Sequence, residues 1–114
     1  MRDYQKVAWS FVKKYKVVYS KFFDIGREDV APCERCILNK ELGKSTNINQ
    51  AVDVHHCHFK SEGGKDVIGN LGGVCRECHD VCHENPAENE LFTQWCKELE
   101  TRKLVIRAFL FREL

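Results

Sequence analysis

Histidine and cysteine gather in one stretch of this 114-residue chain, between Asp53 and His83. The stretch contains four of the seven cysteines and all five histidines, which are His55, His56, His58, His79 and His83. Packing alone gives histidine no reason to cluster, whereas metal binding and proton transfer each need several side chains at one point in space. The stretch therefore predicts half of a structural zinc site and most of a second, catalytic site.

The first constellation consists of two cysteine pairs with metal-type spacing, Cys33-x2-Cys36 and Cys75-x2-Cys78. Four thiolates are the ligand set that Zn²⁺ prefers in closed, tetrahedral structural sites. The pairs are separated by 38 residues, which is longer than a usual finger loop, so we expect folded structure between them. The remaining cysteines, Cys57, Cys82 and Cys96, lack this spacing and are expected to be buried core thiols.

The second constellation consists of the neighbours His55 and His56, followed by His79 and His83. His79 and His83 are four residues apart, so on a helix they share one face and can chelate one ion. Adjacent residues of a strand point to opposite faces, so one imidazole of the first pair can bind a metal while the other stays free. A free imidazole near a metal-bound phosphate has the pKa that a general base for hydrolysis requires.

These residues, together with Asn70, resemble the HNH nuclease family and its ββα-metal motif. The intervals between His56, Asn70 and the two later histidines are similar to those of the nuclease colicins. The frame N-L-G-G-V-C-R-E-C-H, from Asn70 to His79, resembles the zinc-stapled HNH proteins of phages, McrA-like restriction enzymes and homing endonucleases. The resemblance covers about residues 33–84, and the flanking segments resemble no family that we can name.

The resemblance implies a role for each residue. His56 would be the general base that deprotonates the attacking water, and Asn70 would hold the loop that aims it. One divalent catalytic ion would be bound by His55, His79 and His83. The reaction would be hydrolysis of a DNA phosphodiester bond to a product with a 5′-phosphate.

The identity of the catalytic ion is open at this point. Three neutral imidazoles favour Zn²⁺, Ni²⁺ or Mn²⁺ over Mg²⁺. If the ion is Mg²⁺, Asp53 could enter the site instead, because it shares a strand face with His55. His58 could contact phosphate or replace a ligand, although a loop histidine that faces solvent is the simpler interpretation. A further alternative is that His79 or His83 takes the place of one cysteine as a ligand of the zinc ion.

Contacts to DNA are predicted for Lys60, Lys65 and Arg76, which flank the histidines in the sequence. The formal net charge of the whole chain is only +1, but residues 1–23 carry +5 and would extend the basic track. No helix that would read bases is evident, so we expect weak sequence specificity unless a partner protein supplies it. One active site cuts one strand, so a double-strand break would need a homodimer or two encounters.

Two other functions compete with an HNH endonuclease or nickase. The first is a zinc-stapled module that binds nucleic acid without cutting it, and the second is a protein-interaction domain. Either one needs the four paired cysteines. Neither has a use for His56, Asn70, His79 and His83 together, and this favours the enzyme.

The elements that must position these residues predict an α+β domain with a small ββα-metal core at 33–84. Short strands are expected at 51–55 and 72–75, with a glycine-rich loop at 60–69 between them. A helix is expected at 76–84, stopped before Pro86. The segment 27–50 is predicted to be rich in loops, with Cys33 and Cys36 in a zinc knuckle that follows Pro32.

Extensions at 1–26 and 85–114 complete the single predicted domain, 1–114. Apolar residues recur at helical spacing over 3–23, and Gly26 suits the left-handed position that ends such a helix. Asn85 is a good N-cap for a later helix with Pro86 in its first turn and a buried stripe from Leu91 to Leu99. This helix is expected to end near Arg102. The segment 104–111 is apolar on both faces and could be a strand or a last helix.

The first residues, Met-Arg-Asp-Tyr-Gln-Lys, lack the apolar run of a secretory signal, and no stretch of 18 apolar residues is present. An odd number of cysteines, with metal-type spacing, indicates reduced thiols and metal rather than disulfides. We therefore expect the cytoplasm of a bacterial or phage-infected cell.

Overall fold

The computed structural model describes residues 13–26, 29–44 and 47–111. In these ranges the chain forms a small domain of five α-helices, two short 3₁₀ turns and a two-stranded antiparallel sheet. The elements in chain order are α2 (Lys14–Phe23), α3 (Glu34–Glu41), β1 (Asp53–His56), η1 (Lys60–Glu62), η2 (Ile68–Asn70), β2 (Leu71–Val74), α4 (Arg76–Glu84), α5 (Pro86–Cys96) and α6 (Leu99–Phe111).

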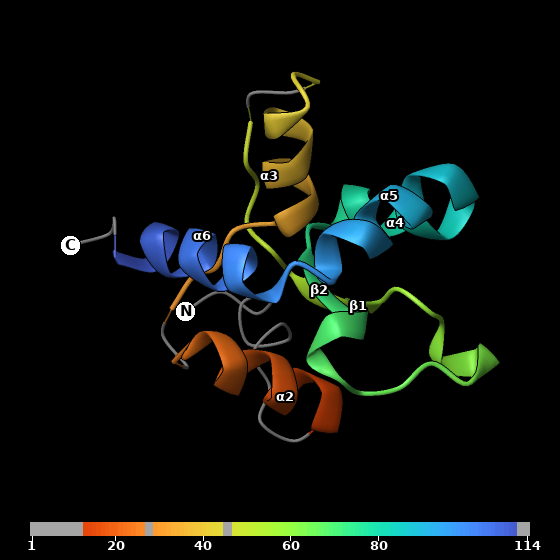
Figure 1. The fold of residues 1–114 in the computed structure, drawn as a ribbon, viewed down its shortest axis with the longest axis horizontal. Coiled ribbons are helices and arrows are strands. Elements are labelled where there is room, and N and C mark those ends of the chain that lie inside the picture. The colour runs from red at the N-terminus through yellow and green to blue at the C-terminus, as the bar shows by residue number, and fades with distance from the viewer. Residues whose placement is uncertain (1–12, 27–28, 45–46, 112–114) are drawn as a thin grey trace.

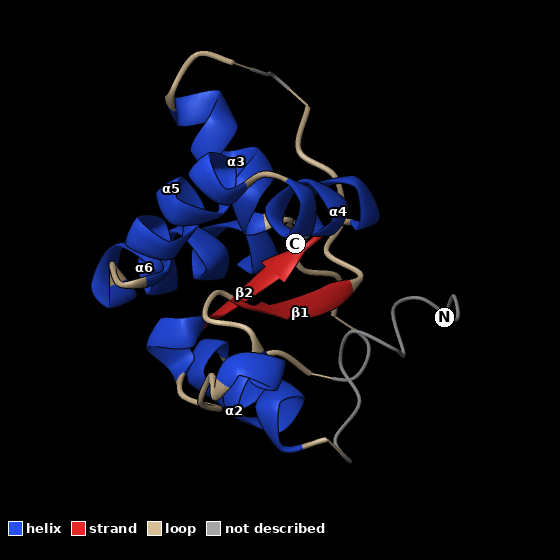
Figure 2. Cartoon of the chain, turned by 90° about the vertical axis from the view of Figure 1, so that its right-hand side faces the viewer, coloured by secondary structure: helices blue, strands red, loops and turns tan. Residues whose placement is uncertain are grey.

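The two strands lie at the centre of the molecule, between helices (Figures 1 and 2). Helix α2 contacts one side of the sheet, while α3 and α4 contact it from the other side, with α5 packed on α4. Strand β1 pairs with β2 so that Asp53 lies opposite Val74 and His56 lies opposite Leu71. Because β2 leads directly into α4, this register brings the histidines of β1 close to those of α4.

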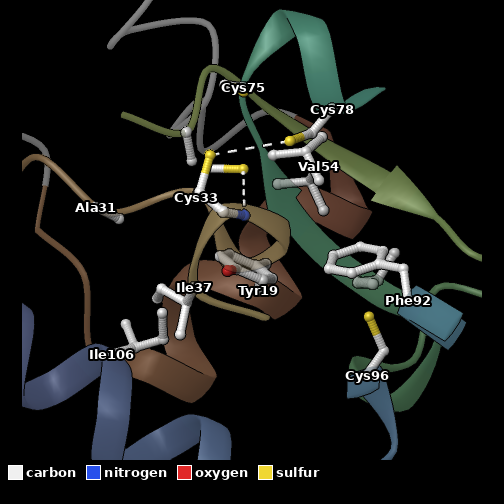
Figure 3. Packing of buried hydrophobic residues seen from close by; sticks show 14 of the residues in the cluster. Tyr19, Ala31, Cys33, Ile37, Val54, Cys75, Cys78, Phe92, Cys96 and Ile106 are labelled. Carbon is white, nitrogen blue, oxygen red and sulfur yellow. Dashed lines mark hydrogen bonds between the residues drawn. The ribbon is translucent and has the colours of Figure 1, made fainter. Parts of the chain in front are cut away.

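Close packing of helices on β2 depends on Gly72 and Gly73. A Cβ atom on Gly72 would lie 2.5 Å from the ring of Phe92 in α5, and one on Gly73 would lie 2.6 Å from the hydroxyl of Tyr19 in α2. Either side chain would force a helix away from the strand. The buried residues around them form one core, and Figure 3 shows Cys33, Cys75 and Cys78 beside one another at its edge.

A buried ion pair joins α3 to α6. Arg102 of α6 and Glu34 of α3 are both fully buried, and the Nε of Arg102 lies 2.7 Å from Oε1 of Glu34. The same carboxylate accepts hydrogen bonds from the Tyr19 hydroxyl, the Trp95 indole at 2.9 Å and the Gly73 amide at 3.2 Å. Paired and hydrogen-bonded, the two charges connect five elements through the core.

The predicted helix over 3–23 is described only from Lys14 onward, and its first part lies outside the described residues. The prediction that Gly26 takes the left-handed position is wrong. The helix ends at Phe23, and Asp24 adopts that conformation with φ 56°. Aspartate tolerates this region because its short polar side chain can hydrogen-bond locally.

The segment around the first cysteine pair differs from the predicted loop and zinc knuckle. Residues Glu34–Glu41 form helix α3, and Cys33 is its N-cap, with Sγ accepting a hydrogen bond from the Cys36 amide at 3.4 Å. Cysteine is outside the usual set of N-cap residues, so the sequence lacked the ordinary signal for a helix start. Both cysteines of the pair therefore lie at the beginning of a helix.

The C-terminal segment forms two helices where one was predicted to reach Arg102. Helix α5 ends at Cys96, and α6 begins at Leu99 and includes the ambiguous segment 104–111. A continuous helix would separate residues 95 and 102 by about 10 Å along its axis. The break lets both side chains reach the carboxylate of Glu34.

Other predictions for the elements agree closely with the structure. The helix predicted at 76–84 is confirmed as α4, and Asn85 caps α5 by accepting hydrogen bonds from the amides of Ala87 and Glu88. The strands begin one or two residues away from their predicted starts. The loop at 60–69 contains a 3₁₀ turn at each end rather than irregular chain alone.

Candidate metal centres and the adjoining cavity

The four paired cysteines come together between two helix starts. Cys33 and Cys75 are the residues before α3 and α4, and Cys36 and Cys78 lie in the first turns of these helices. Their sulfur atoms all lie within 4.8 Å of one another, and all four residues are buried. Tetrahedral Zn–S bonds of about 2.3 Å place sulfurs about 3.8 Å apart, and the Cys36 and Cys78 sulfurs are 3.9 Å apart. The cluster could hold a structural metal ion.

Donors around the cysteine cluster fit a set of thiolates. Arg35 donates to the sulfur of Cys78 at 3.4 Å and, through its other nitrogen, to Glu88 of α5 at 2.5 Å. The side-chain amide of Asn49 lies 3.8 Å from the sulfur of Cys75. The positive ends of two helix dipoles also point at the cluster. These groups reduce the cost of burying negative sulfur.

Hydrogen bonding among the four thiols shifts their pKa values in opposite directions. The hydrogen bond with Cys33 lowers the pKa of Cys36 to about 7, and hydrogen bonds with Cys33 and Cys36 lower the pKa of Cys75. The hydrogen bond with Cys36 contributes most to raising the pKa of Cys33. Four adjacent thiolates repel one another, so metal binding here has to displace the protons that the thiols share.

The second cluster joins His55 of β1 to His79 and His83 of α4. The ring centroid of His55 lies 5.1 Å from that of His79 and 5.2 Å from that of His83. The Nε2 atoms of His79 and His83 are 3.2 Å apart, and one nitrogen from each of the three rings fits within 4.8 Å of the others. When two nitrogen ligands each lie about 2.0–2.1 Å from one tetrahedral ion, the distance between the two nitrogens is close to this 3.2 Å.

The chemistry of His55 provides a test of whether this cluster suits a metal. Its side chain is buried, and its Nδ1 has no hydrogen-bond partner among the described residues. A buried polar atom without a partner is costly, and a bound cation would satisfy it. Burial lowers the pKa of His55 to about 4 and also lowers the pKa of His79. Both rings are therefore neutral at pH 7, which is the form that binds metal. The cluster fits a metal ion.

Residues outside the cluster hold the three imidazoles in place. Nε2 of His55 lies 2.8 Å from Oδ1 of Asn89 in α5, and Nδ1 of His79 lies 3.7 Å from the carboxylate of Asp53. Asp53 is itself paired with Lys16 of α2 at 3.4 Å. The ring of His83 stacks on Phe59 with 4.7 Å between centroids. Carboxylate and amide partners of this kind orient metal-binding histidines in proteins.

A cavity of about 410 Å³ adjoins the histidine cluster. Its walls include Tyr15, Asp53, His56, Lys60, His79 and His83. Two imidazoles of the cluster therefore share one cavity with the histidine that was predicted to act as the base. The cavity is large enough for a phosphate group with part of its sugar, and solvent reaches the exposed ring of His83.

His56 is separate from the three-histidine cluster, as the alternation of a strand requires, but it is not free. Its Nε2 lies 2.8 Å from Oδ1 of Asp66, and its ring packs on Tyr15 with 4.7 Å between centroids. The hydrogen bond with His56 contributes most to lowering the pKa of Asp66. Burial, followed by the charges of Asp53 and Asp66, raises the pKa of Tyr15, so its phenol stays protonated at pH 7.

Asn70 fastens the loop that joins β1 to β2. Its Oδ1 accepts a hydrogen bond from the amide of His58 at 2.7 Å, and its Nδ2 donates to the carbonyls of His58 and Lys65 at 3.1 and 3.0 Å. These bonds fix the backbone two residues after His56. The side chain of His58 itself is exposed.

The residues predicted to contact DNA lie at the surface, but they differ in their surroundings. Lys60 lines the cavity, and its ammonium is 2.9 Å from both carboxylate oxygens of Asp66. Lys65 and Arg76 are exposed, and neither lines the cavity. Cys57, Cys82 and Cys96 are buried free thiols, as expected.

Sequence reasoning missed Asp66, Asn89, Tyr15 and Arg35. Asp66 and Tyr15 are ordinary residues of a loop and of an amphipathic helix, and nothing local marks them. Asn89 had a weak signal, because asparagine in the interior of a helix is unfavourable without another purpose. Arg35 lies between two metal-type cysteines, where a cationic donor to sulfur could have been expected.

No protein-family model matches the chain, and neither a curated protein nor a solved structure matches it. Among the residues that the structure describes, no helix is both long and apolar enough to cross a membrane.

Proposed function

We propose that this protein is a metal-dependent endonuclease that hydrolyses phosphodiester bonds in DNA with the ββα-metal arrangement of the HNH family. One juxtaposition carries the proposal. Two of the three clustered imidazoles, His79 and His83, line the same cavity as His56, and the third, His55, has a buried nitrogen without a partner. A metal site and a proton acceptor on one cavity that has room for a phosphate group suit hydrolysis of a phosphodiester.

In this proposal His55, His79 and His83 hold the catalytic divalent ion. Three imidazoles favour Zn²⁺, Ni²⁺ or Mn²⁺, with Mg²⁺ the least suited to the set. The bound ion supplies Lewis-acid stabilisation of the charge that develops on the phosphate and on the leaving oxygen. Asp53 stays outside the ligand set, because its carboxylate lies beside Nδ1 of His79 and pairs with Lys16.

His56 acts as the general base. An ionised carboxylate can only accept hydrogen bonds, so Asp66 keeps the proton of neutral His56 on Nε2 and leaves the lone pair on Nδ1. That lone pair takes a proton from water as the water oxygen bonds to phosphorus. The bond from phosphorus to the 3′-oxygen breaks, the departing oxygen takes a proton from solvent, and the products carry a 5′-phosphate and a 3′-hydroxyl. Asp66 is a positioning residue in this scheme.

The remaining parts of the proposal concern the scaffold and the DNA. Asn70 holds the loop that follows His56, and Lys60, Lys65 and Arg76 contact the DNA backbone. The four paired cysteines hold a structural Zn²⁺ that fixes the start of α4, so that His79 follows directly after a rigid ligand, Cys78. Backbone contacts dominate this arrangement, and we therefore expect low sequence specificity.

A plasmid assay tests the proposal. Supercoiled DNA is incubated with the protein and Mg²⁺, Mn²⁺, Ni²⁺ or Zn²⁺, and nicked and linear products are measured. We expect cutting by the wild type and a 10²- to 10⁴-fold lower rate for His56→Ala, because a general base contributes about that much. His58→Ala is the matched control, since it removes an exposed imidazole from the same loop and should cut at the wild-type rate.

The competing function is a zinc-stapled module that binds nucleic acid without cutting. One observation favours it: His56 and Lys60 are both engaged with Asp66, so two groups that the enzyme needs are held in internal pairs. If the protein retains DNA in an electrophoretic shift but does not cut it in the presence of any of the four ions, this function is supported and the nuclease is rejected. Equal cutting by His56→Ala and the wild type would reject the assigned base.

A further inference from the structure

Asn89, in the middle of α5, makes two side-chain hydrogen bonds that fix its orientation. Its Nδ2 donates to the carbonyl of Cys57 at 3.0 Å, and its Oδ1 lies 2.8 Å from Nε2 of His55. A flipped amide would place its oxygen against the carbonyl of Cys57, where neither atom can donate. The oxygen of Asn89 therefore faces His55.

This orientation determines where the proton of His55 lies. The amide oxygen can only accept a hydrogen bond, so Nε2 of His55 must be the donor. In a neutral imidazole the proton is then on Nε2 and the lone pair is on Nδ1. Nδ1 is the buried nitrogen without a hydrogen-bond partner in the described part of the chain.

We propose that Asn89 is a positioning residue that fixes His55 in the tautomer with Nδ1 free, so that Nδ1 is the atom offered to the ion shared with His79 and His83. This inference rests on the ligand set of the proposed function. It assigns a task to the C-terminal extension, for which the resemblance to the HNH family gives none. A hydrogen bond to the second nitrogen of a ligand histidine also makes the first a better ligand.

The preceding residue extends the role of α5. Glu88 accepts a hydrogen bond from Arg35, which also donates to the sulfur of Cys78. Two neighbouring residues of α5, Glu88 and Asn89, therefore support the two candidate metal centres. Asn85 caps the start of α5 by accepting hydrogen bonds from the amides of Ala87 and Glu88. Asn89 in turn donates its own backbone amide to the carbonyl of Asn85.

The test begins with the tautomer of His55, measured by long-range ¹H–¹⁵N correlation spectra of ¹⁵N-histidine protein without added Ni²⁺. We expect wild-type His55 to carry its proton on Nε2 and Asn89→Leu to lose that preference. Calorimetric titration with Ni²⁺ should then show affinity reduced about 10- to 100-fold in Asn89→Leu. Asn85→Ala is the matched control, because it weakens the same helix without touching either cluster, and it should keep the wild-type tautomer.

Two results would overturn the inference. One is a wild-type His55 with its proton on Nδ1, a measurement that needs no variant and stands even if Asn89→Leu fails to fold. The other is a folded Asn89→Leu protein with the wild-type tautomer and the wild-type Ni²⁺ affinity. Absence of DNA cutting would reject the nuclease but would leave the tautomer and the Ni²⁺ affinity unchanged, so the two failures are distinguishable.

Discussion

The cysteine cluster and the histidine cluster both include residues of α4, where Cys78 and His79 are neighbours in the chain, yet their surroundings differ. The cysteines are all buried, and two helix starts and side-chain donors lie beside them. The histidines range from the buried His55 to the exposed His83 and adjoin a cavity. A closed set of four ligands suits a structural ion, whereas three ligands on a cavity leave positions for water and substrate.

Because of this difference, we expect substitutions in the two clusters to have separate effects on stability and on chemistry. Changes at the cysteines should act on the fold, and changes at the histidines should act on ions and DNA with little effect on the fold. A protein in which both clusters behaved alike would contradict the assignment of one structural and one working site.

The largest effect is expected for Cys78→Ala. Structural Zn²⁺ binds thiolate sites with about 10–16 kcal/mol, which is comparable to the entire stability of a domain, about 5–15 kcal/mol. We expect the variant to bind no zinc and to lack a cooperative thermal transition, measured by native mass spectrometry and circular dichroism.

Cys82→Ala is the control for that experiment, because it removes a buried thiol of the same helix that belongs to neither cluster. It should retain one zinc and lose about 1 kcal/mol of stability. Equal, small losses in the two variants would show that the cysteine cluster does not hold the fold.

The second-largest effect is expected for Arg102→Leu, which tests whether the cysteine cluster alone fixes α3. Arg102→Leu leaves the carboxylate of Glu34 buried without its ion pair, and removing one partner of such a pair costs about 3–5 kcal/mol. Urea unfolding with zinc bound measures the loss. The double variant Glu34→Leu, Arg102→Leu should recover part of it, since no charge is then left unpaired. A loss below about 1 kcal/mol in the single variant would mean that the metal cross-link suffices.

The third-largest effect is the stabilisation of the protein by Ni²⁺ bound at the histidine cluster. Wild-type protein should gain about 2.7 kcal/mol at Ni²⁺ concentrations 100-fold above the dissociation constant, seen as a higher melting temperature. His79→Ala should melt near the wild-type temperature without Ni²⁺ and gain almost nothing when Ni²⁺ is added. If His79→Ala instead unfolds without any added ion, this cluster also belongs to the scaffold.

The sequence predicted those parts of the site that depend on short spacing. The four-residue interval between His79 and His83 requires only one helix, and each Cys-x2-Cys pair requires only one turn. The hairpin that brings His55 to α4 also follows from local signals, because β2 runs directly into the helix. Within each pair, therefore, the candidate ligands are close in the chain.

Parts that depend on distant partners could not be predicted. Glu34 and Arg102 are separated by 68 positions, and neither carries a local sign of burial. Asn89 and His55 meet only because α5 packs on α4, across 34 positions. The start of α3 was missed for a different reason, since Cys33 serves both as a cap and as a candidate ligand, and the second use concealed the first.

The smallest effect is expected for Lys60→Met, and it addresses the cavity side of the comparison. The ion pair between Lys60 and Asp66 is exposed on the lysine side, and such pairs contribute about 0–1 kcal/mol, so stability should hardly change. If the cavity receives DNA, loss of one phosphate contact should weaken binding and reduce the slope of log affinity against log salt by about 1. Fluorescence anisotropy with a labelled duplex at several salt concentrations measures both.

Lys97→Met is the matched control, because Lys97 is an exposed lysine at the end of α5 that does not line the cavity. Its removal lowers the total charge by the same amount, so any general electrostatic effect appears in both variants. Only Lys60→Met should change the salt slope. Identical slopes in the two variants would mean that DNA does not approach this cavity. The histidine cluster would then bind an ion without a substrate beside it, and the distinction between a structural and a working site would no longer hold.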